Sequence, residues 1–272
     1  MGIPMYFVND KFLPHDEANI HVTDLGLLRG YGIFDFFRVV NGESIFLEDH
    51  LDRFFNSAAQ LHLTVPHERP KLREAIAEIA RLNAAPLLGV KLILTGGYST
   101  DGYEPAAEPN LIMIAKPFAL HNKPDGLTLM THHFQRELPT IKSLNYLTPI
   151  SQLVRQKSVG ADDILYHFNN RVSESSRSNI FIFKNETLIT PKDHILFGIT
   201  RKHILHAAKS IFKVEERAIT LEELYDADEV FLSASTKRVA PVSRIDDHRF
   251  NPAGVCSAKL LEALMSEEKN ND

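Results

Sequence analysis

Cysteine and tryptophan are nearly missing from this chain, which has one cysteine, Cys256, and no tryptophan in 272 residues. A lone cysteine excludes an intramolecular disulfide and a cysteine-cluster metal site, which suits a reducing compartment, so we expect a cytoplasmic protein. The sequence also has no apolar run near the roughly 20 residues that a membrane helix needs. Its N-terminus lacks a basic segment followed by an apolar one, the pattern of a targeting signal.

An excess of positive charge is absent as well. The 30 basic and 35 acidic residues give a formal net charge of −5, so the chain has no overall electrostatic signature of binding to nucleic acid or to an anionic membrane. The 44% hydrophobic and 24% charged residues are typical of a globular protein with ample core material. A chain of this length predicts one large domain or two medium ones.

The first half of the chain has the pattern of an α+β domain. Asn9-Asp10 and Asn41-Gly42 each separate two short apolar segments, as the turns of β-hairpins do. Apolar residues then recur at helical spacing, and two further strand-like runs flank a loop rich in glycine and proline. We expect strands at 5–8, 11–13, 33–40, 44–47, 90–95 and 110–116, and helices at 48–61 and 70–83.

The second half is rich in strands, with helices between them. A polar segment containing proline and glycine, 119–126, predicts a linker between a domain at 1–118 and a larger one at 127–272. We expect strands at 127–133, 164–168, 180–183, 187–189 and 229–233, helices at 148–159, 200–212 and 221–225, and a frayed terminus from 266 to 272.

Four motifs follow one another in this half. Lys142 lies in Leu-Pro-Thr-Ile-Lys-Ser-Leu-Asn-Tyr-Leu, and Glu174 lies in Arg-Val-Ser-Glu-Ser-Ser-Arg-Ser-Asn-Ile-Phe. Gly-Ile-Thr at 198–200 opens a helix, and Ser-Ala-Ser-Thr at 233–236 follows a strand. In this order the motifs resemble the class IV, or fold-type IV, pyridoxal-phosphate enzymes. That family includes branched-chain aminotransferases, D-amino-acid aminotransferases and aminodeoxychorismate lyases.

The resemblance runs from about Tyr6 to Val242 and implies a fold, a cofactor and an assembly. The implied fold is α+β with two domains, a small N-terminal α+β domain and a larger C-terminal domain that is barrel-like with helices. The implied cofactor is pyridoxal 5′-phosphate. Family members also build each substrate pocket partly from a partner subunit, which implies a homodimer, and the Phe36-Phe37 pair with Tyr98 and Tyr103 would suit its interface.

Two residues match the catalytic pair of the family. Lys142 matches the lysine that holds the cofactor aldehyde, and a site shielded from water would lower the pKa of its amine, leaving it able to attack and to move protons. Glu174 matches the acid that pairs with the pyridinium nitrogen, although Ser175 stands where the family commonly has glycine. Without the resemblance, Lys142 reads as a surface lysine and Glu174 as an exposed loop carboxylate.

Further positions match residues that bind the cofactor. The backbone of Ile199 and Thr200 opens a helix, where free N–H groups and the helix dipole favour an anion such as phosphate. Arg53 and Ser235 match the additional phosphate contacts of the family, and Tyr146 matches the tyrosine that hydrogen-bonds the ring hydroxyl. From its helical pattern alone, Arg53 would lie on a solvated face.

The resemblance also implies residues that bind the substrate, namely Phe34, Arg38, Lys91, Tyr103 and Thr236. Asp101 departs from the pattern, because D-amino-acid aminotransferases carry a carboxylate-binding arginine there. It either lines the pocket and repels a carboxylate or caps the turn before Gly102.

Three functions remain open at this stage. The chain is an aminotransferase acting on an amino acid, with a branched-chain type of substrate as one option, or a 4-amino-4-deoxychorismate lyase of folate biosynthesis that releases pyruvate and 4-aminobenzoate. A non-catalytic pyridoxal-phosphate carrier would need Lys142 but not Glu174. We expect no metal site, since His203 and His206 share one helix without an evident third ligand.

Overall fold

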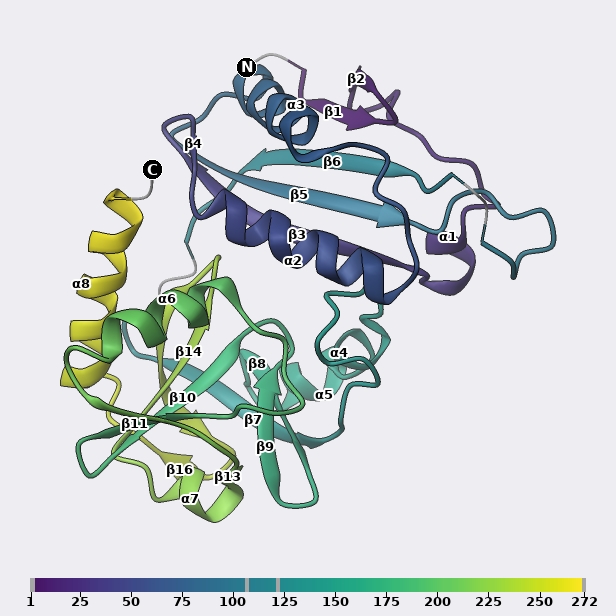
Figure 1. Cartoon of the computed structure of the whole chain (residues 1–272). Helices are drawn as coiled ribbons and strands as arrows, with labels where there is room; N and C mark the ends of the chain where they lie inside the picture. The colour runs from purple at the N-terminus through teal and green to yellow at the C-terminus, as the bar shows by residue number, and fades with distance from the viewer. Residues whose placement is uncertain (1–2, 106–107, 121–122, 271–272) are drawn as a thin grey trace. The chain divides into compact units, whose positions relative to one another are not determined.

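A computed structural model describes residues 3–105, 108–120 and 123–270 (Figure 1). The chain divides into two compact units, unit 1 with Met1–Ala119 and Ile141–Asn145, and unit 2 with Leu120–Thr140 and Tyr146–Asp272. The segment that carries Lys142 therefore belongs to unit 1, whereas the sequence placed it in the second domain. Residues 121 and 122 of the predicted linker lie outside the described residues.

Unit 1 contains a six-stranded antiparallel sheet in the order β2-β1-β6-β5-β3-β4. The predicted hairpin at Asn9-Asp10 is confirmed, because both turn residues have positive φ and β1 pairs with β2. The predicted strand at 44–47 is wrong beyond Ser44, since Leu47 already begins a helix. The strands are β1 (Met5–Val8), β2 (Lys11–Pro14), β3 (Gly32–Val40), β4 (Glu43–Ser44), β5 (Leu87–Thr95) and β6 (Leu111–Pro117).

Two amphipathic helices pack against this sheet. In α2 (Leu47–Gln60), Leu51 and Phe54 have no exposed surface, and in α3 (Arg69–Leu82) the same holds for Leu72 and Ile79. Burying a side chain of this size stabilises the fold by about 1.5–3 kcal/mol, so the two helical faces and the sheet form one core. A short helix, α1 (Leu25–Arg29), lies before β3 and is capped by Asp24.

Unit 2 contains a closed barrel. Strands β10, β14, β15, β7, β8 and β9 are neighbours in that order, and β9 pairs again with β10 through Glu174 and Asn179. Apolar side chains from these strands form a second core. The strands are β7 (Leu127–His133), β8 (Asp163–Phe168), β9 (Arg171–Ser175), β10 (Asn179–Lys184), β11 (Thr187–Thr190), β12 (Lys213–Glu216), β13 (Ile219–Thr220), β14 (Glu229–Ala234), β15 (Arg238–Ile245) and β16 (His248–Arg249).

The helices of unit 2 differ from the sequence prediction in three places. The helix predicted at 200–212 spans Ile199–Ala208 and so ends four residues early. The helix predicted at 148–159 is interrupted at Gln152, and the C-terminal helix α8 was not predicted. Because Leu260 and Leu264 of α8 are buried, this helix stays ordered through Lys269, and the prediction of fraying from Ser266 is wrong. The helices are α4 (Leu147–Ser151), α5 (Leu153–Ser158), α6 (Ile199–Ala208), α7 (Leu221–Tyr225) and α8 (Val255–Lys269).

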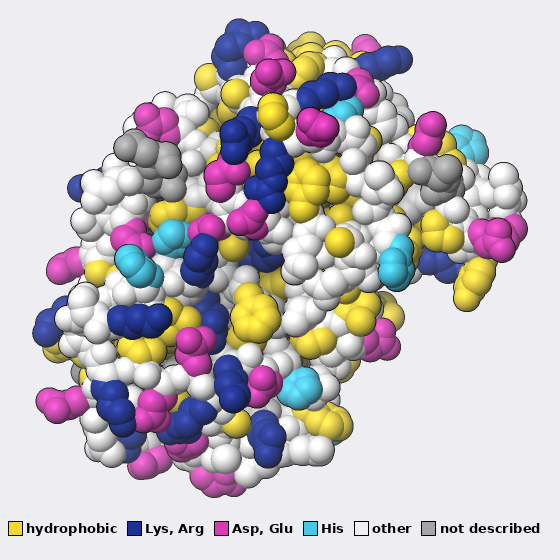
Figure 2. All heavy atoms as spheres, viewed as in Figure 1, with side chains coloured by type: hydrophobic (Ala, Val, Ile, Leu, Met, Phe, Trp, Pro, Cys, Tyr) yellow, Lys and Arg dark blue, Asp and Glu magenta, His cyan; other side chains and the backbone are white. Residues whose placement is uncertain are grey.

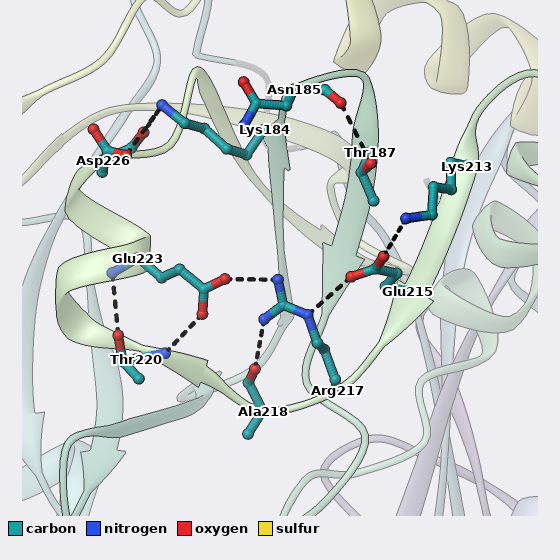
Figure 3. Close-up of polar contacts among 10 residues, drawn as sticks. All are labelled: Lys184, Asn185, Thr187, Lys213, Glu215, Arg217, Ala218, Thr220, Glu223 and Asp226. Carbon is teal, nitrogen blue, oxygen red and sulfur yellow. Dashed lines mark hydrogen bonds and ion pairs between the residues drawn. The ribbon is translucent and has the colours of Figure 1, made fainter.

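A polar network fastens α7 to the neighbouring strands (Figure 3). Thr220 and Glu223 form a capping box at the start of the helix. The guanidinium of Arg217 joins Glu223 to Glu215 on β12 and donates to the carbonyl of Ala218. These side chains are partly exposed, so their ion pairs contribute little stability beyond fixing the local geometry.

The surface carries both charge signs. In Figure 2, basic and acidic side chains are interspersed on the visible face of each unit, as the small net charge leads one to expect. Among the described residues, no helix is both long enough and apolar enough to cross a membrane.

Candidate functional site

The backbone around Lys142 is held against the start of β3. The carbonyl of Lys142 accepts a hydrogen bond from Phe34 N at 2.9 Å, and Leu144 N donates to Gly32 O at 3.0 Å. Ser143 forms an isolated bridge with Ile33. A Cβ on Gly32 would lie 2.6 Å from Leu94 O and 2.8 Å from a Leu144 methyl, so only glycine allows this approach. The segment therefore presents Lys142 from a fixed backbone.

The Phe34 ring lies near two ammonium groups. Lys142 Nζ is 4.7 Å from the ring centroid and Lys91 Nζ is 5.3 Å from it, both within the range of a cation–π contact. Burial, together with the charge of Lys116, lowers the pKa of Lys91. Unit 1 thus brings together three predicted residues, whereas a fourth, Arg38, is buried in β3 with 3% of its surface exposed.

Arg53 belongs to a buried network and not to a solvated face. Its Nε and Nη2 atoms each donate to the carboxylate of Asp35 at 2.8 Å, and His50 Nδ1 lies 2.7 Å from the same carboxylate. Burial alone would raise the pKa of Asp35, but the charges of Arg53 and His50 hold it well below its ordinary value. Asp35 and His50 were not predicted as partners of Arg53. The signal that the sequence offered is that His50 lies three positions before Arg53, on the same face of a helix.

This network also reaches the lysine segment. Burial lowers the pKa of His50, Asp35 partly offsets this, and the charges of Arg53 and Lys142 lower it further. Ser57, one turn after Arg53 on α2, accepts a hydrogen bond from Lys142 N at 3.4 Å. The segment of Lys142 therefore lies close to the network of Asp35, His50 and Arg53 in unit 1.

Glu174 lies in unit 2 at the closure of the barrel. Only 4% of the residue is exposed, which rules out the loop carboxylate considered from the sequence. One carboxylate oxygen accepts from Arg136 Nη1 at 2.9 Å, and the other accepts from Leu196 N at 3.0 Å. Arg136 was not predicted as a partner of Glu174. The only signal in the sequence was that a basic residue stands six positions before Lys142.

The start of α6 approaches this carboxylate through Asn179. The Asn179 side chain donates to Leu196 O at 2.8 Å, and a Cβ on Gly198 would lie 2.2 Å from the Asn179 side-chain oxygen. No side chain caps the helix at Gly198, and Ile199 and Thr200 are buried. An uncapped helix start with a glycine that permits close approach is suited to an anion.

The remaining predicted site residues differ in burial. Ser235 and Thr236 are half-buried in the turn between β14 and β15, and the nearby Ser233 hydroxyl is buried without a hydrogen-bond partner in the described chain. Burial raises the pKa of Tyr146. Tyr103 is 78% exposed, so unit 1 does not bring it to Phe34.

Asp101 caps its turn. Its carboxylate accepts from the backbone of Tyr103 at 2.8 Å, from the backbone of Glu104 at 2.9 Å and from the Ser99 hydroxyl at 2.9 Å. These backbone hydrogen bonds lower the pKa of Asp101. Of the two alternatives left open by the sequence, the geometry favours the turn cap.

Other polar groups lie apart from these residues. His203 and His206 both contact Glu267, yet the described residues contain no group of three or more side chains that could hold a metal ion. A cavity of about 460 Å³ in unit 2, lined by Phe168, Arg171 and neighbouring residues, includes none of the predicted site residues.

Comparison with known proteins identifies the fold and the family. Residues 32–245 match the family described as Amino-transferase class IV. The chain is 32% identical over 269 residues to a putative branched-chain-amino-acid aminotransferase of Methanocaldococcus jannaschii, covering 94% of this chain and 93% of the relative. It is 30% identical over 255 residues to a D-alanine aminotransferase of Listeria monocytogenes, covering 88% of this chain and 86% of the relative.

Solved structures agree. A branched-chain aminotransferase of Thermoproteus uzoniensis with norvaline superposes with a TM-score of 0.89 at 26% identity, covering 100% of this chain and 96% of the other. A second branched-chain amino acid aminotransferase, complexed with N-(5′-phosphopyridoxyl)-L-glutamate, superposes with a TM-score of 0.91 at 26% identity and the same coverage. The predicted α+β fold class, with a barrel in its larger part, is confirmed.

Proposed function

This chain belongs to the class IV aminotransferase family and is an aminotransferase, and from that premise we propose that it holds pyridoxal 5′-phosphate and transfers the amino group of a branched-chain type of amino acid. The family uses this cofactor, and relatives have been solved with its derivatives. The observation that carries the proposal is the buried Glu174 carboxylate, held by Arg136 and a backbone N–H in the same unit as the uncapped start of α6.

The residues fit the chemistry of this cofactor. Within unit 2, the N–H groups at the start of α6 and the hydroxyl of Ser235 suit its phosphate. The orphaned Ser233 hydroxyl adds a polar atom to the Ser235 segment. Glu174 provides the acid for the ring nitrogen, and Lys142 provides the primary amine for the aldehyde.

When bound, the cofactor supplies an electron sink for negative charge that develops on the α-carbon of the substrate. Glu174 would keep the ring nitrogen of the cofactor protonated, and Arg136 stabilises the negative charge of Glu174. Once freed from the aldehyde, the amine of Lys142 would take the α-proton of the substrate and later return a proton, which requires a neutral amine.

The substrate class is supported by the relatives and by unit 1. Phe34 offers an apolar ring for a side chain, and Lys91 beside it offers an ammonium group for a carboxylate. Asp101 is engaged in its turn, and a carboxylate anchor of the kind expected there in D-amino-acid enzymes is missing. We therefore place L-leucine, L-isoleucine and L-valine ahead of D-alanine as amino donors.

The test has two parts. The purified protein is loaded with the cofactor and treated with borohydride, and mass spectrometry should find the phosphopyridoxyl group on the peptide containing Lys142. The loaded protein is then given each amino acid with 2-oxoglutarate, and formation of glutamate and the matching keto acid is measured. Lys142→Ala serves as the control and should give neither label nor turnover.

Each contrary result has a clear meaning. Label on another lysine would overturn the role of Lys142. Pyruvate and 4-aminobenzoate formed from aminodeoxychorismate, with no keto acid from any amino acid, would establish the lyase in place of the aminotransferase. Cofactor bound at Lys142 without either activity would indicate a carrier.

A further inference from the structure

A buried ion pair lies directly beside the Glu174 segment. Lys237 Nζ lies 3.0 Å from Ser178 Oγ and 3.4 Å from Asp163 Oδ2, and the side chains of Lys237 and Asp163 are only 7% and 4% exposed. Asp163 begins β8, whereas Lys237 lies in the turn between β14 and β15. The pair therefore joins parts of the barrel that are distant in sequence.

On one side the pair holds the turn that follows Glu174. Asp163 accepts hydrogen bonds from the hydroxyls of Ser175 and Ser176, and Lys237 donates to Ser178. Within this turn, Ser175 N donates to Ser178 O at 2.8 Å. Three serine side chains thus fix the backbone immediately after the acid.

On the other side the pair holds the turn that contains Ser235 and Thr236. Lys237 N donates to Ala234 O at 3.0 Å, which closes this turn, and the side chain then reaches toward Ser178. One lysine therefore connects the turn after Glu174 with the turn of Ser235.

We propose that Lys237 is a positioning residue, which fixes the distance between Glu174 and Ser235 so that both meet a bound cofactor at once. This inference rests on the function proposed above, in which these residues contact opposite ends of pyridoxal phosphate.

Stability alone does not account for the pair. Removing two charges from water costs several kcal/mol, and apolar replacements of a buried pair are often at least as stable. Burial lowers the pKa of Lys237, and the charge of Asp163 partly offsets this. The pair is better explained by the geometry that it imposes on the two turns.

The experiment measures cofactor affinity and stability separately. Lys237→Met, Asp163→Asn, Ser178→Ala and the double variant Asp163→Asn with Lys237→Met are titrated with pyridoxal phosphate as cofactor-free proteins, and their unfolding in urea is recorded. Lys184→Met is the control, because Lys184 also pairs with aspartates of unit 2, Asp226 (Figure 3) and Asp228, which lie outside the two turns.

We expect Lys237→Met to raise the Kd for pyridoxal phosphate about tenfold or more, which corresponds to roughly 1.4 kcal/mol. Ser178→Ala, which keeps both charges, should raise it by a smaller factor. The double variant should regain the stability that Lys237→Met loses and still bind weakly. Wild-type Kd in all these variants, or an affinity that recovers with stability in the double variant, would overturn the proposal.

A second readout does not need the cofactor. Hydrogen exchange at the amides of Ser175 and Lys237 in the cofactor-free protein should accelerate in Lys237→Met and stay unchanged in Lys184→Met. Unchanged exchange in Lys237→Met would refute the link between the turns. Failure of the wild-type protein to bind pyridoxal phosphate would instead refute the proposed function. The exchange result would still test whether Lys237 links the two turns.

Discussion

At the residue scale, the sequence motifs identify side chains, and the structure adds the partners that hold them. Arg136 pairs with Glu174, and Asp35 pairs with Arg53. In both cases a charged group that the motif supplies is oriented by a second charge from another element. Charge-assisted hydrogen bonds of this kind are strong enough to fix a side chain before a ligand arrives.

The role of Glu174 can be tested by removing its charge alone. Glu174→Gln should keep the cofactor but lower kcat roughly 10²–10³-fold, the usual effect of losing one preorganised electrostatic group. A neutral amide cannot hold a proton on the ring nitrogen, whereas it preserves the shape and can still accept from Leu196 N. Steady-state kinetics with the absorbance of the bound cofactor would measure both effects, and near-normal kcat would disprove the role.

The Asp35 network predicts a pH-dependent stability. Because the pKa of Asp35 is held below its ordinary value of 3.8, its contribution is complete above that pH and decreases as the pH falls further. Asp35→Asn removes the buried negative charge that Arg53 and His50 face and should lower the free energy of unfolding by about 3–5 kcal/mol at pH 7. The gap between wild type and variant should narrow below about pH 4, as urea titrations at several pH values would reveal.

For Asp101, we predict that a substitution changes the substrate preference little. Since its carboxylate caps an exposed turn, Asp101→Arg should lower the urea midpoint of unfolding only slightly. The ratio of kcat/KM for L-leucine and D-alanine should stay unchanged. A shift of that ratio toward D-alanine would place position 101 in the substrate pocket after all.

At the scale of elements, local signals and packing make separate contributions. The capping box of Thr220 and Glu223 fixes where α7 begins, and the predicted bounds of this helix agree with the observed ones, Leu221–Tyr225. Strand β9 and helix α8 carry weaker local signals and depend on their neighbours. Glu174 is buried because β9 closes the barrel against β10. No local sequence pattern predicts this pairing.

The contribution of the α7 capping box to the free energy of unfolding can be measured directly. Thr220→Ala removes the acceptor for Glu223 N and should lower the free energy of unfolding by about 0.5–2 kcal/mol. Thr187→Ala is a fitting control, since its hydroxyl only reaches the carbonyl of Asn185 (Figure 3). Equal losses in both variants would mean that the capping box contributes nothing specific.

At the scale of the whole molecule, apolar surface points to an assembly. Leu147, Ile150 and Val154 on α4 and α5 are 76%, 61% and 82% exposed, and neighbouring apolar side chains at this density often mark an interface. The predicted interface pair Phe36-Phe37 cannot contribute both side chains to an interface, because Phe37 is fully buried in the core of unit 1.

We expect a homodimer that depends on this apolar surface. Val154→Glu should shift the protein toward monomers in light scattering, because a charge would have to be desolvated on association. Val255→Glu on α8 provides a control with a similarly exposed valine. A wild-type monomer, or a Val154→Glu dimer as stable as wild type, would contradict the expectation.

The sequence by itself determined the family, the α+β fold class, most strands and helices with strong periodicity, and the order of the motifs, because these depend on residues close together in the chain. Only the tertiary structure decided which residues hold those motifs. It placed the segment of Lys142 in unit 1, paired Arg53 with Asp35, and joined Lys237 to Asp163. These contacts link residues far apart in sequence, and the barrel closure and core packing that create them leave no local pattern.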